Sequence, residues 1–99
     1  MGLSKQKENK FQAKVLSFLK KEVGGYWIDI VVSTYQSKGE PDIVGCKDGQ
    51  FYAFELKVDD YKASEAQKEK LRRINLSGGV AMEVRSIDEL RELFNVYKV

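Results

Sequence analysis

Two acidic side chains have a spacing in this sequence that could do chemistry. Asp42 and Glu55 lie in apolar stretches on either side of Asp48 and Gly49, and an Asp-Gly pair between such stretches is typical of a tight β-hairpin turn. A hairpin that closes symmetrically about this turn places Asp42 opposite Glu55, with Cβ atoms about 4.5–5.5 Å apart. Like charges so close need compensation, and a Mg²⁺ ion held by one or two carboxylates would provide it.

Lys57 adds a cation to the same surface. It follows Glu55 by two residues, so the alternation of a strand places both side chains on one face, while Phe54 and Leu56 point to the other. The three charges have a second interpretation, in which the carboxylates point into water or simply pair with Lys57. An odd-length loop would also shift the register by one residue and separate Asp42 from Glu55.

Glu8 is a candidate third acid. It precedes Phe11 by three residues and Val15 by seven, which places it on the apolar stripe of an N-terminal helix. A glutamate on such a stripe calls for a partner. The alternative is a first-turn glutamate that interacts with the helix dipole and points into solvent.

The composition limits the chemistry that these residues can perform. The sequence has no histidine and one cysteine, Cys46, which excludes Cys/His zinc sites and Ser-His or Cys-His nucleophilic pairs. A lone cysteine also excludes an intramolecular disulfide, and we expect Cys46 to be a small buried residue at the end of a strand. Residues 1–10 are polar and no stretch is long enough to span a bilayer, so we expect a cytoplasmic protein without membrane contact.

The elements that must position these residues follow from hydrophobic periodicity and from two capping boxes, which begin at Ser64 and Ser86. Because a helix connects the third and fourth strands, we expect an α/β fold with a mixed sheet flanked by helices, in one domain over residues 1–99. The expected elements are a helix over 5–22, strands over 26–33, 42–46 and 50–58, a helix over 64–76, a strand over 80–85 and a C-terminal helix from 86 to about 94.

Two short motifs give this order a specific meaning. Gly39-Glu40-Pro41-Asp42, followed across the hairpin by Phe54-Glu55-Leu56-Lys57, resembles the PD-(D/E)XK nuclease superfamily, and within it the virus-type replication-repair nuclease (VRR-NUC) domain. The resemblance covers nearly the whole chain and implies a restriction-endonuclease-like α-β-β-β-α-β core with an extra C-terminal helix.

The resemblance also implies roles for individual residues. Glu8, Asp42, Glu55 and the backbone carbonyl of Leu56 would bind Mg²⁺ or Mn²⁺, and Asp42, Glu55, Lys57 and Gln67 would form the catalytic group. Gln67 has a competing interpretation, since it is the last residue of the first capping box and could serve only the backbone of Ser64.

Basic residues on two helices are candidates for contacts with DNA phosphates. Lysines recur at helical spacing near the N-terminus, and further basic residues crowd the second helix, where Arg72 and Arg73 are the stronger candidates. The alternative is that both rows are solvated helix faces. The candidates are Lys10, Lys14, Lys68, Arg72 and Arg73.

These residues together predict a Mg²⁺- or Mn²⁺-dependent endodeoxyribonuclease. The resemblance to the VRR-NUC domain further implies that it is encoded by a phage or prophage and acts in a bacterial cell. Stand-alone VRR-NUC domains are similar to junction-resolving homodimers, so the resemblance favours a homodimer that cuts Holliday junctions. The alternatives are a related nuclease acting on other DNA or RNA, and a non-catalytic nucleic-acid-binding module. Apolar residues beyond the needs of the core would fit a dimer, unless they complete the core of the monomer: Trp27, Tyr35, Phe94, Val96, Tyr97 and Val99.

Overall fold

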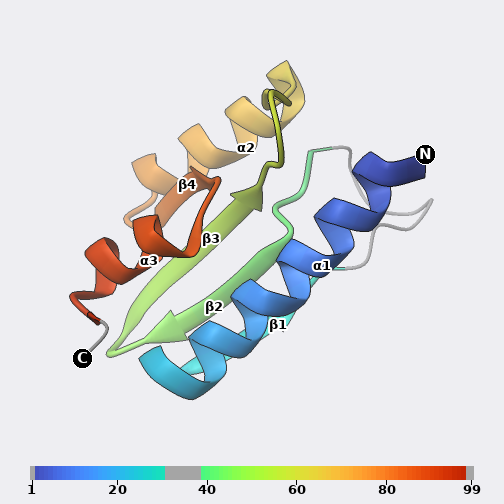
Figure 1. Cartoon of the computed structure of the whole chain (residues 1–99). Helices are drawn as coiled ribbons and strands as arrows, with labels where there is room; N and C mark the ends of the chain where they lie inside the picture. The colour runs from blue at the N-terminus through green and yellow to red at the C-terminus, as the bar shows by residue number, and fades with distance from the viewer. Residues whose placement is uncertain (1, 31–38, 98–99) are drawn as a thin grey trace.

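The computed structural model describes residues 2–30 and 39–97, and it has the predicted order of helices and strands (Figure 1). The sheet order is β1-β2-β3-β4, with antiparallel pairing up to β3 and parallel pairing between β3 and β4. The predicted mixed sheet is therefore confirmed. The elements are α1 (Gly2–Phe18), a π-helical turn η1 (Leu19–Val23), β1 (Tyr26–Asp29), β2 (Ile43–Lys47), β3 (Gln50–Leu56), α2 (Glu65–Leu76), β4 (Val80–Val84) and α3 (Ile87–Phe94).

The β2–β3 hairpin has the predicted register. Ile43 pairs with Phe54 and Lys47 pairs with Gln50 around a two-residue turn. Asp48 and Gly49 both adopt positive φ angles, 53° and 81°, as a hairpin turn of this length requires. Strand β3 ends at Leu56, earlier than predicted, and β1 ends at Asp29, while residues 31–33 of the predicted first strand lie outside the described residues.

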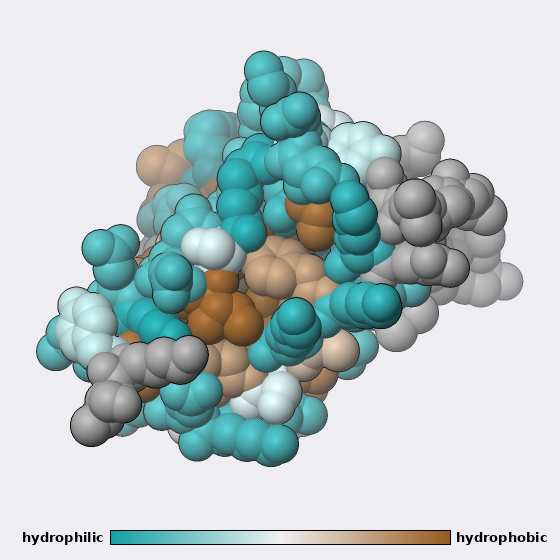
Figure 2. Space-filling model, viewed as in Figure 1, coloured by the Kyte–Doolittle hydropathy of each residue, from teal (hydrophilic) through white to brown (hydrophobic). Residues whose placement is uncertain are grey.

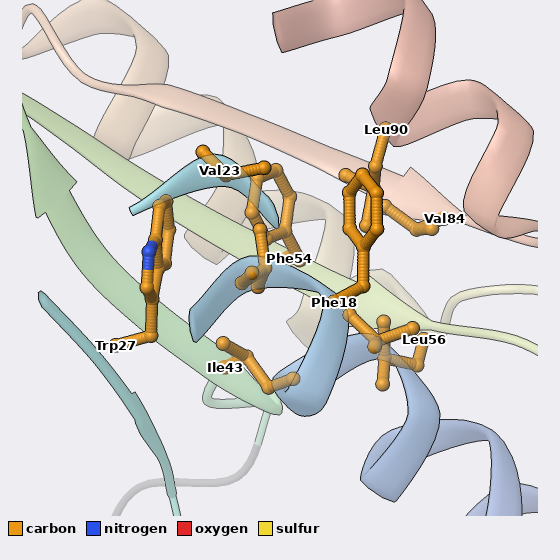
Figure 3. Packing of buried hydrophobic residues seen from close by; sticks show 10 residues of the cluster. Phe18, Val23, Trp27, Ile43, Phe54, Leu56, Val84 and Leu90 are labelled. Carbon is orange, nitrogen blue, oxygen red and sulfur yellow. The ribbon is translucent and has the colours of Figure 1, made fainter. Parts of the chain in front are cut away.

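Helices cover both faces of the sheet. In Figure 1, α1 and α3 lie in front of the strands and α2 lies behind them. The main core forms under α1 and α3, where Phe18, Phe54 and Leu90 are buried together (Figure 3). In Figure 2, apolar residues are visible between the polar surfaces of α1 and α3. A smaller cluster joins Leu71 of α2 to Ala53 and Ala81, so α2 packs mainly on β3 and β4.

Trp27 is one of the apolar residues expected to exceed the needs of the core, but it is buried in the monomer. Its side chain is 2% exposed, stacks on Phe54, and donates a hydrogen bond of 2.7 Å from Nε1 to the carbonyl oxygen of Gly24. Phe94 and Val96 also pack against the core, so these residues complete the monomer. Tyr97 is exposed, whereas Tyr35 and Val99 lie outside the described residues.

Cys46 is also placed differently from the prediction. It is exposed, not buried. The register puts Cys46 opposite Phe51, near the turn on the sheet face that α2 covers mainly over β3 and β4. Among the described helices, none is long and apolar enough to cross a membrane.

Candidate metal and catalytic site

The site is built around Glu55, near the end of β3. Its side chain is in the core layer beneath α2, and the residue is 2% exposed. Oε1 accepts a hydrogen bond of 2.9 Å from Nε2 of Gln67 and lies 3.6 Å from Nζ of Lys57. Oε2 is buried and has no hydrogen-bond partner among the described residues. A buried carboxylate oxygen without a partner is costly, so this atom indicates a missing ligand or a proton.

Asp42 reaches the same place from the segment that leads into β2. Its backbone N–H donates to the carbonyl oxygen of Phe54 at 3.0 Å, and its Oδ2 accepts the backbone N–H of Leu56 at 2.8 Å. The regular ladder ends at the Ile43–Phe54 pair. The charge of Asp42 nevertheless acts on Glu55, so the structure brings the two carboxyl groups near each other, although not as a regular cross-strand pair.

This environment raises the pKa of Glu55 to about 8. Burial is the largest cause, followed by the nearby charge of Asp42, while Lys57 acts in the opposite direction. In the absence of a cation, Glu55 is therefore mostly protonated at neutral pH. A divalent cation could take the place of that proton, and two carboxylates with one unpartnered oxygen are the oxygen donors that Mg²⁺ prefers.

Gln67 connects the two charged residues of β3. Its side-chain oxygen accepts hydrogen bonds from Nζ of Lys57 at 2.9 Å and from the backbone N–H of Ser64 at 2.8 Å. Its Nε2 donates the hydrogen bond to Oε1 of Glu55. The hydroxyl of Ser64 accepts the backbone N–H of Gln67 and completes the capping box. Both interpretations of Gln67 therefore hold in one geometry, because the residue that caps α2 also orients Glu55 and Lys57.

Glu8 lies apart from this pair. It is half-buried on α1, and no three His, Cys, Asp or Glu side chains of the described residues are close enough to hold a metal ion together. The backbone of Leu56 is better placed. Its N–H contacts Asp42, and the N–H and C=O of one strand residue point to the same side, so its carbonyl also faces the Asp42 side of β3.

No protein-family model matches the chain, and no curated protein matches it. A solved structure described as a VRR_NUC domain protein is 20% identical, covers 89% of this chain and 84% of its own, and superposes with a TM-score of 0.72. A second, described as a VRR_NUC domain, is 20% identical, covers 93% and 98%, and gives a TM-score of 0.73.

The chain has the VRR_NUC fold. The resemblance that the sequence motifs suggested is thus confirmed at the level of the fold. A third structure is Hjc from Archaeoglobus fulgidus, a Holliday junction resolvase from an archaeal hyperthermophile. It is 23% identical, covers 76% of this chain and 64% of its own, and has a TM-score of 0.59.

Within the VRR_NUC fold, the structure adds two residues that sequence reasoning missed. Glu83 pairs in register with Glu55 across the parallel β3–β4 pair, and Arg85 follows it by two residues on the same face. Nη2 of Arg85 lies 3.5 Å from Oε1 of Glu83. Their alternation in β4 was visible in the sequence, but nothing in the sequence said which residue of β3 they would meet.

Two further contacts hold the segment before Asp42 against α2. Nζ of Lys70 lies 2.9 Å from Oε1 of Glu40, and both side chains are only about one-third exposed (28% and 32%). Gly39, with φ +88°, approaches the backbone of α2 so closely that an added Cβ would lie 2.7 Å from the carbonyl carbon of Ala66. The glycine of the first motif therefore allows the Asp42 segment to dock on α2.

The candidate DNA-binding residues differ in their pairing. Arg72 makes two hydrogen bonds to Glu69, at 2.9 and 2.8 Å, and Nε of Arg73 contacts the same carboxylate at 3.1 Å. Lys68 lies 3.6 Å from Glu65. Lys10 and Lys14 are exposed on α1 and have no carboxylate partner among the residues described here. Lys7, on the same helix, is paired with Asp59.

Proposed function

We propose that this chain is a Mg²⁺- or Mn²⁺-dependent endodeoxyribonuclease of the PD-(D/E)XK type that cuts four-way DNA junctions as a homodimer. The observation that carries the proposal is the buried Glu55 carboxylate, which has an unpartnered oxygen beside Asp42 and is tied to Lys57 through Gln67. The VRR_NUC fold and the likeness to a Holliday junction resolvase support the choice of substrate. We place the reaction in a bacterial cytoplasm, with a phage or prophage origin for the gene.

Each residue of the site has a proposed task. Asp42, Glu55 and the carbonyl of Leu56 would hold the cation, and Glu8, which lies apart from them in the structure, is the weaker candidate for a further ligand. The bound cation would polarise the scissile phosphate and lower the pKa of a water molecule. Lys57 would orient that water or take its proton and would stabilise negative charge on the phosphate. Gln67 would keep Glu55 and Lys57 in place, since it already contacts both.

The test is a cleavage assay with Mg²⁺ or Mn²⁺ on junction, flap, duplex and single-stranded DNA. We expect preferential cutting of the junction, loss of cutting in Asp42→Asn, and binding of the cation but about 10²- to 10⁴-fold slower cutting in Lys57→Ala, the range for a positioned acid or base. Arg91→Gln, which alters a pair with Glu22 outside the site, is the matched control and should cut normally.

Two results would contradict the proposal. Normal cutting by Asp42→Asn would exclude the metal mechanism. DNA binding without cutting by the wild-type protein under every condition would favour the non-catalytic alternative, and preferential cutting of RNA or of linear duplex would reassign the substrate.

A further inference from the structure

A segment without helix or strand separates the two halves of the proposed site. Lys57 lies at its start and Ser64, the N-cap of α2, lies at its end, while most of the residues between them are exposed. The bonds from Gln67 to Glu55 and Lys57 form only if this segment brings α2 back over β3. Its conformation therefore determines whether the site is assembled.

Arg85 holds this segment from the neighbouring strand. It follows β4 directly, and its guanidinium donates from Nη1 to the carbonyl oxygen of Asp59 at 3.2 Å and from Nη2 to that of Tyr61 at 2.6 Å. The rigid fork of a guanidinium suits two acceptors that stand side by side, whereas the ammonium group of a lysine presents a single point charge. Glu83, 3.5 Å from Nη2, holds the guanidinium on the same side.

The segment needs such an anchor because parts of its conformation are unfavourable. Asp59 adopts φ +53°, in the left-handed region that non-glycine residues rarely occupy. The ion pair between Lys7 and Asp59 also touches the segment, but both side chains are more than half exposed (57% and 51%), and exposed pairs of this kind stabilise little. The two carbonyl contacts of Arg85 connect the segment directly to the end of β4.

We infer that Arg85 is a positioning residue of the proposed nuclease: its contacts with Asp59 and Tyr61 hold the β3–α2 connection so that Gln67 remains bonded to Glu55 and Lys57. This inference rests on the proposed function for its effect on cutting. The effect on Gln67 is a property of the fold and can be measured without DNA.

The experiment compares Arg85→Gln and Arg85→Lys with Arg91→Gln, whose guanidinium joins α3 to Glu22 at 3.0 Å. In ¹⁵N-labelled protein, we expect the side-chain amide hydrogens of Gln67 to exchange about tenfold faster in Arg85→Gln, because the bond to Glu55 opens more often. With saturating junction DNA, kcat should fall about 10- to 100-fold with KM changed little, since a misplacement of about 1 Å can cost this much. Arg85→Lys should show intermediate values and Arg91→Gln neither change.

Two results for Arg85→Gln overturn the inference. If kcat falls while the exchange of the Gln67 amide is unchanged, Arg85 acts in another way, such as by contacting DNA. If kcat and the exchange rate of the Gln67 amide both stay at the wild-type level, the contacts of Arg85 with Asp59 and Tyr61 are irrelevant to the site. If Arg85→Gln fails to fold, Arg85→Lys is decisive, and wild-type exchange of Gln67 in that variant would count against positioning. A wild-type protein without nuclease activity would refute the proposed function and leave the exchange measurement to decide the role of Arg85.

Discussion

Glu55 is the residue at which folding and the proposed catalysis oppose each other. A carboxylic acid that is 2% exposed and next to Asp42 is costly to ionise, so the metal-free protein retains a proton there. The same burial makes Glu55 a strong ligand once a cation is present, because the positive charge of the cation then compensates the buried negative charge of the carboxylate. Metal binding should therefore release a proton below about pH 8.

The raised pKa of Glu55 predicts how stability depends on pH. The pKa is about 8 in the folded protein and 4.5 in the reference state, so between these values the unfolded chain loses a proton that the folded chain keeps. The free energy of unfolding should therefore fall as pH rises through this window, by on the order of a few kcal/mol. Urea unfolding in chelator from pH 5 to pH 9 measures this.

Glu55→Gln is the matched variant for this measurement. Because it cannot ionise, it should lose the pH dependence and exceed the wild type in stability near pH 9, while Mg²⁺ should stabilise only the wild type. The sequence contains no histidine, which otherwise titrates in this range, so no histidine titration overlaps with that of Glu55. Equal slopes for the two proteins would show that Glu55 is not the titrating group.

At the scale of elements, the N-terminus of α2 is shared between helix capping and the site. Ser64 and Gln67 complete a capping box, and the same Gln67 side chain orients Glu55 and Lys57. The segment of Asp42 docks on this turn through Gly39 and the ion pair between Glu40 and Lys70. The hairpin and α2 are therefore assembled as one unit around the carboxylates.

The close approach of Gly39 to α2 predicts the effect of Gly39→Ala. The added Cβ would lie 2.7 and 2.8 Å from the carbonyl carbon and oxygen of Ala66 and 2.9 Å from the nitrogen of Gln67, all backbone atoms that cannot move independently. We expect a loss of about 1–3 kcal/mol in stability and weaker binding of Mn²⁺ by calorimetry, because Asp42 is displaced. Gly49→Ala is the control: its φ is +81° but nothing lies within 4 Å, so Mn²⁺ binding should be unchanged. Equal Mn²⁺ affinity in both variants would refute the docking role.

The basic rows on α1 and α2 should contribute differently to DNA binding. Arg72 and Arg73 share the carboxylate of Glu69, whereas Lys10 and Lys14 lack a carboxylate partner in the described part of the chain. Each phosphate contact contributes about 0.9 to the slope of log affinity against log salt concentration.

We therefore expect the double variant Lys10→Gln/Lys14→Gln to lower the slope by about 2, and Arg72→Gln/Arg73→Gln by about 1. Fluorescence anisotropy with labelled junction DNA at several salt concentrations, without divalent ions, gives the slopes. Wild-type slopes in both double variants would identify the two rows as solvated helix faces.

At the scale of the whole molecule, one chain supplies one pair of carboxylates, whereas resolving a four-way junction requires two related cuts. A dimer gains no support from Trp27, Phe94 and Val96, because these residues complete the core of the monomer. Large apolar side chains are nevertheless exposed on the described surface: Tyr26, Ile28, Phe51, Tyr61, Leu76, Leu93 and Tyr97.

The proposed homodimer can be tested by light scattering and by mixing wild-type chains with variant chains. We expect the mass of two chains at micromolar concentration, since two-fold dimers are the commonest oligomers and fit a two-fold junction. Mixed dimers of wild type and Asp42→Asn should nick one strand of the junction without resolving it. A monomeric mass, or complete resolution by mixed dimers, would exclude the paired-cut arrangement.

The sequence by itself determined what depends on neighbours in the chain. The Asp-Gly turn and the alternation of the two strands brought Asp42 to Glu55 and placed Lys57 on their face, because a hairpin's register follows from its turn. The capping box at Ser64 likewise located the start of α2 and hence Gln67.

Only the tertiary structure decided the contacts between elements that are distant in the chain. The burial of Trp27, the exposure of Cys46 and the reach of Arg85 to the carbonyls of Asp59 and Tyr61 all depend on which part of the sheet each helix covers. The pairing of Glu83 with Glu55 depends on how far α2 carries the chain before β4 begins, and a parallel pair has no turn to set its register. Local patterns specify which faces are apolar, but the packing of those faces on one another determines which polar residues meet at their edges.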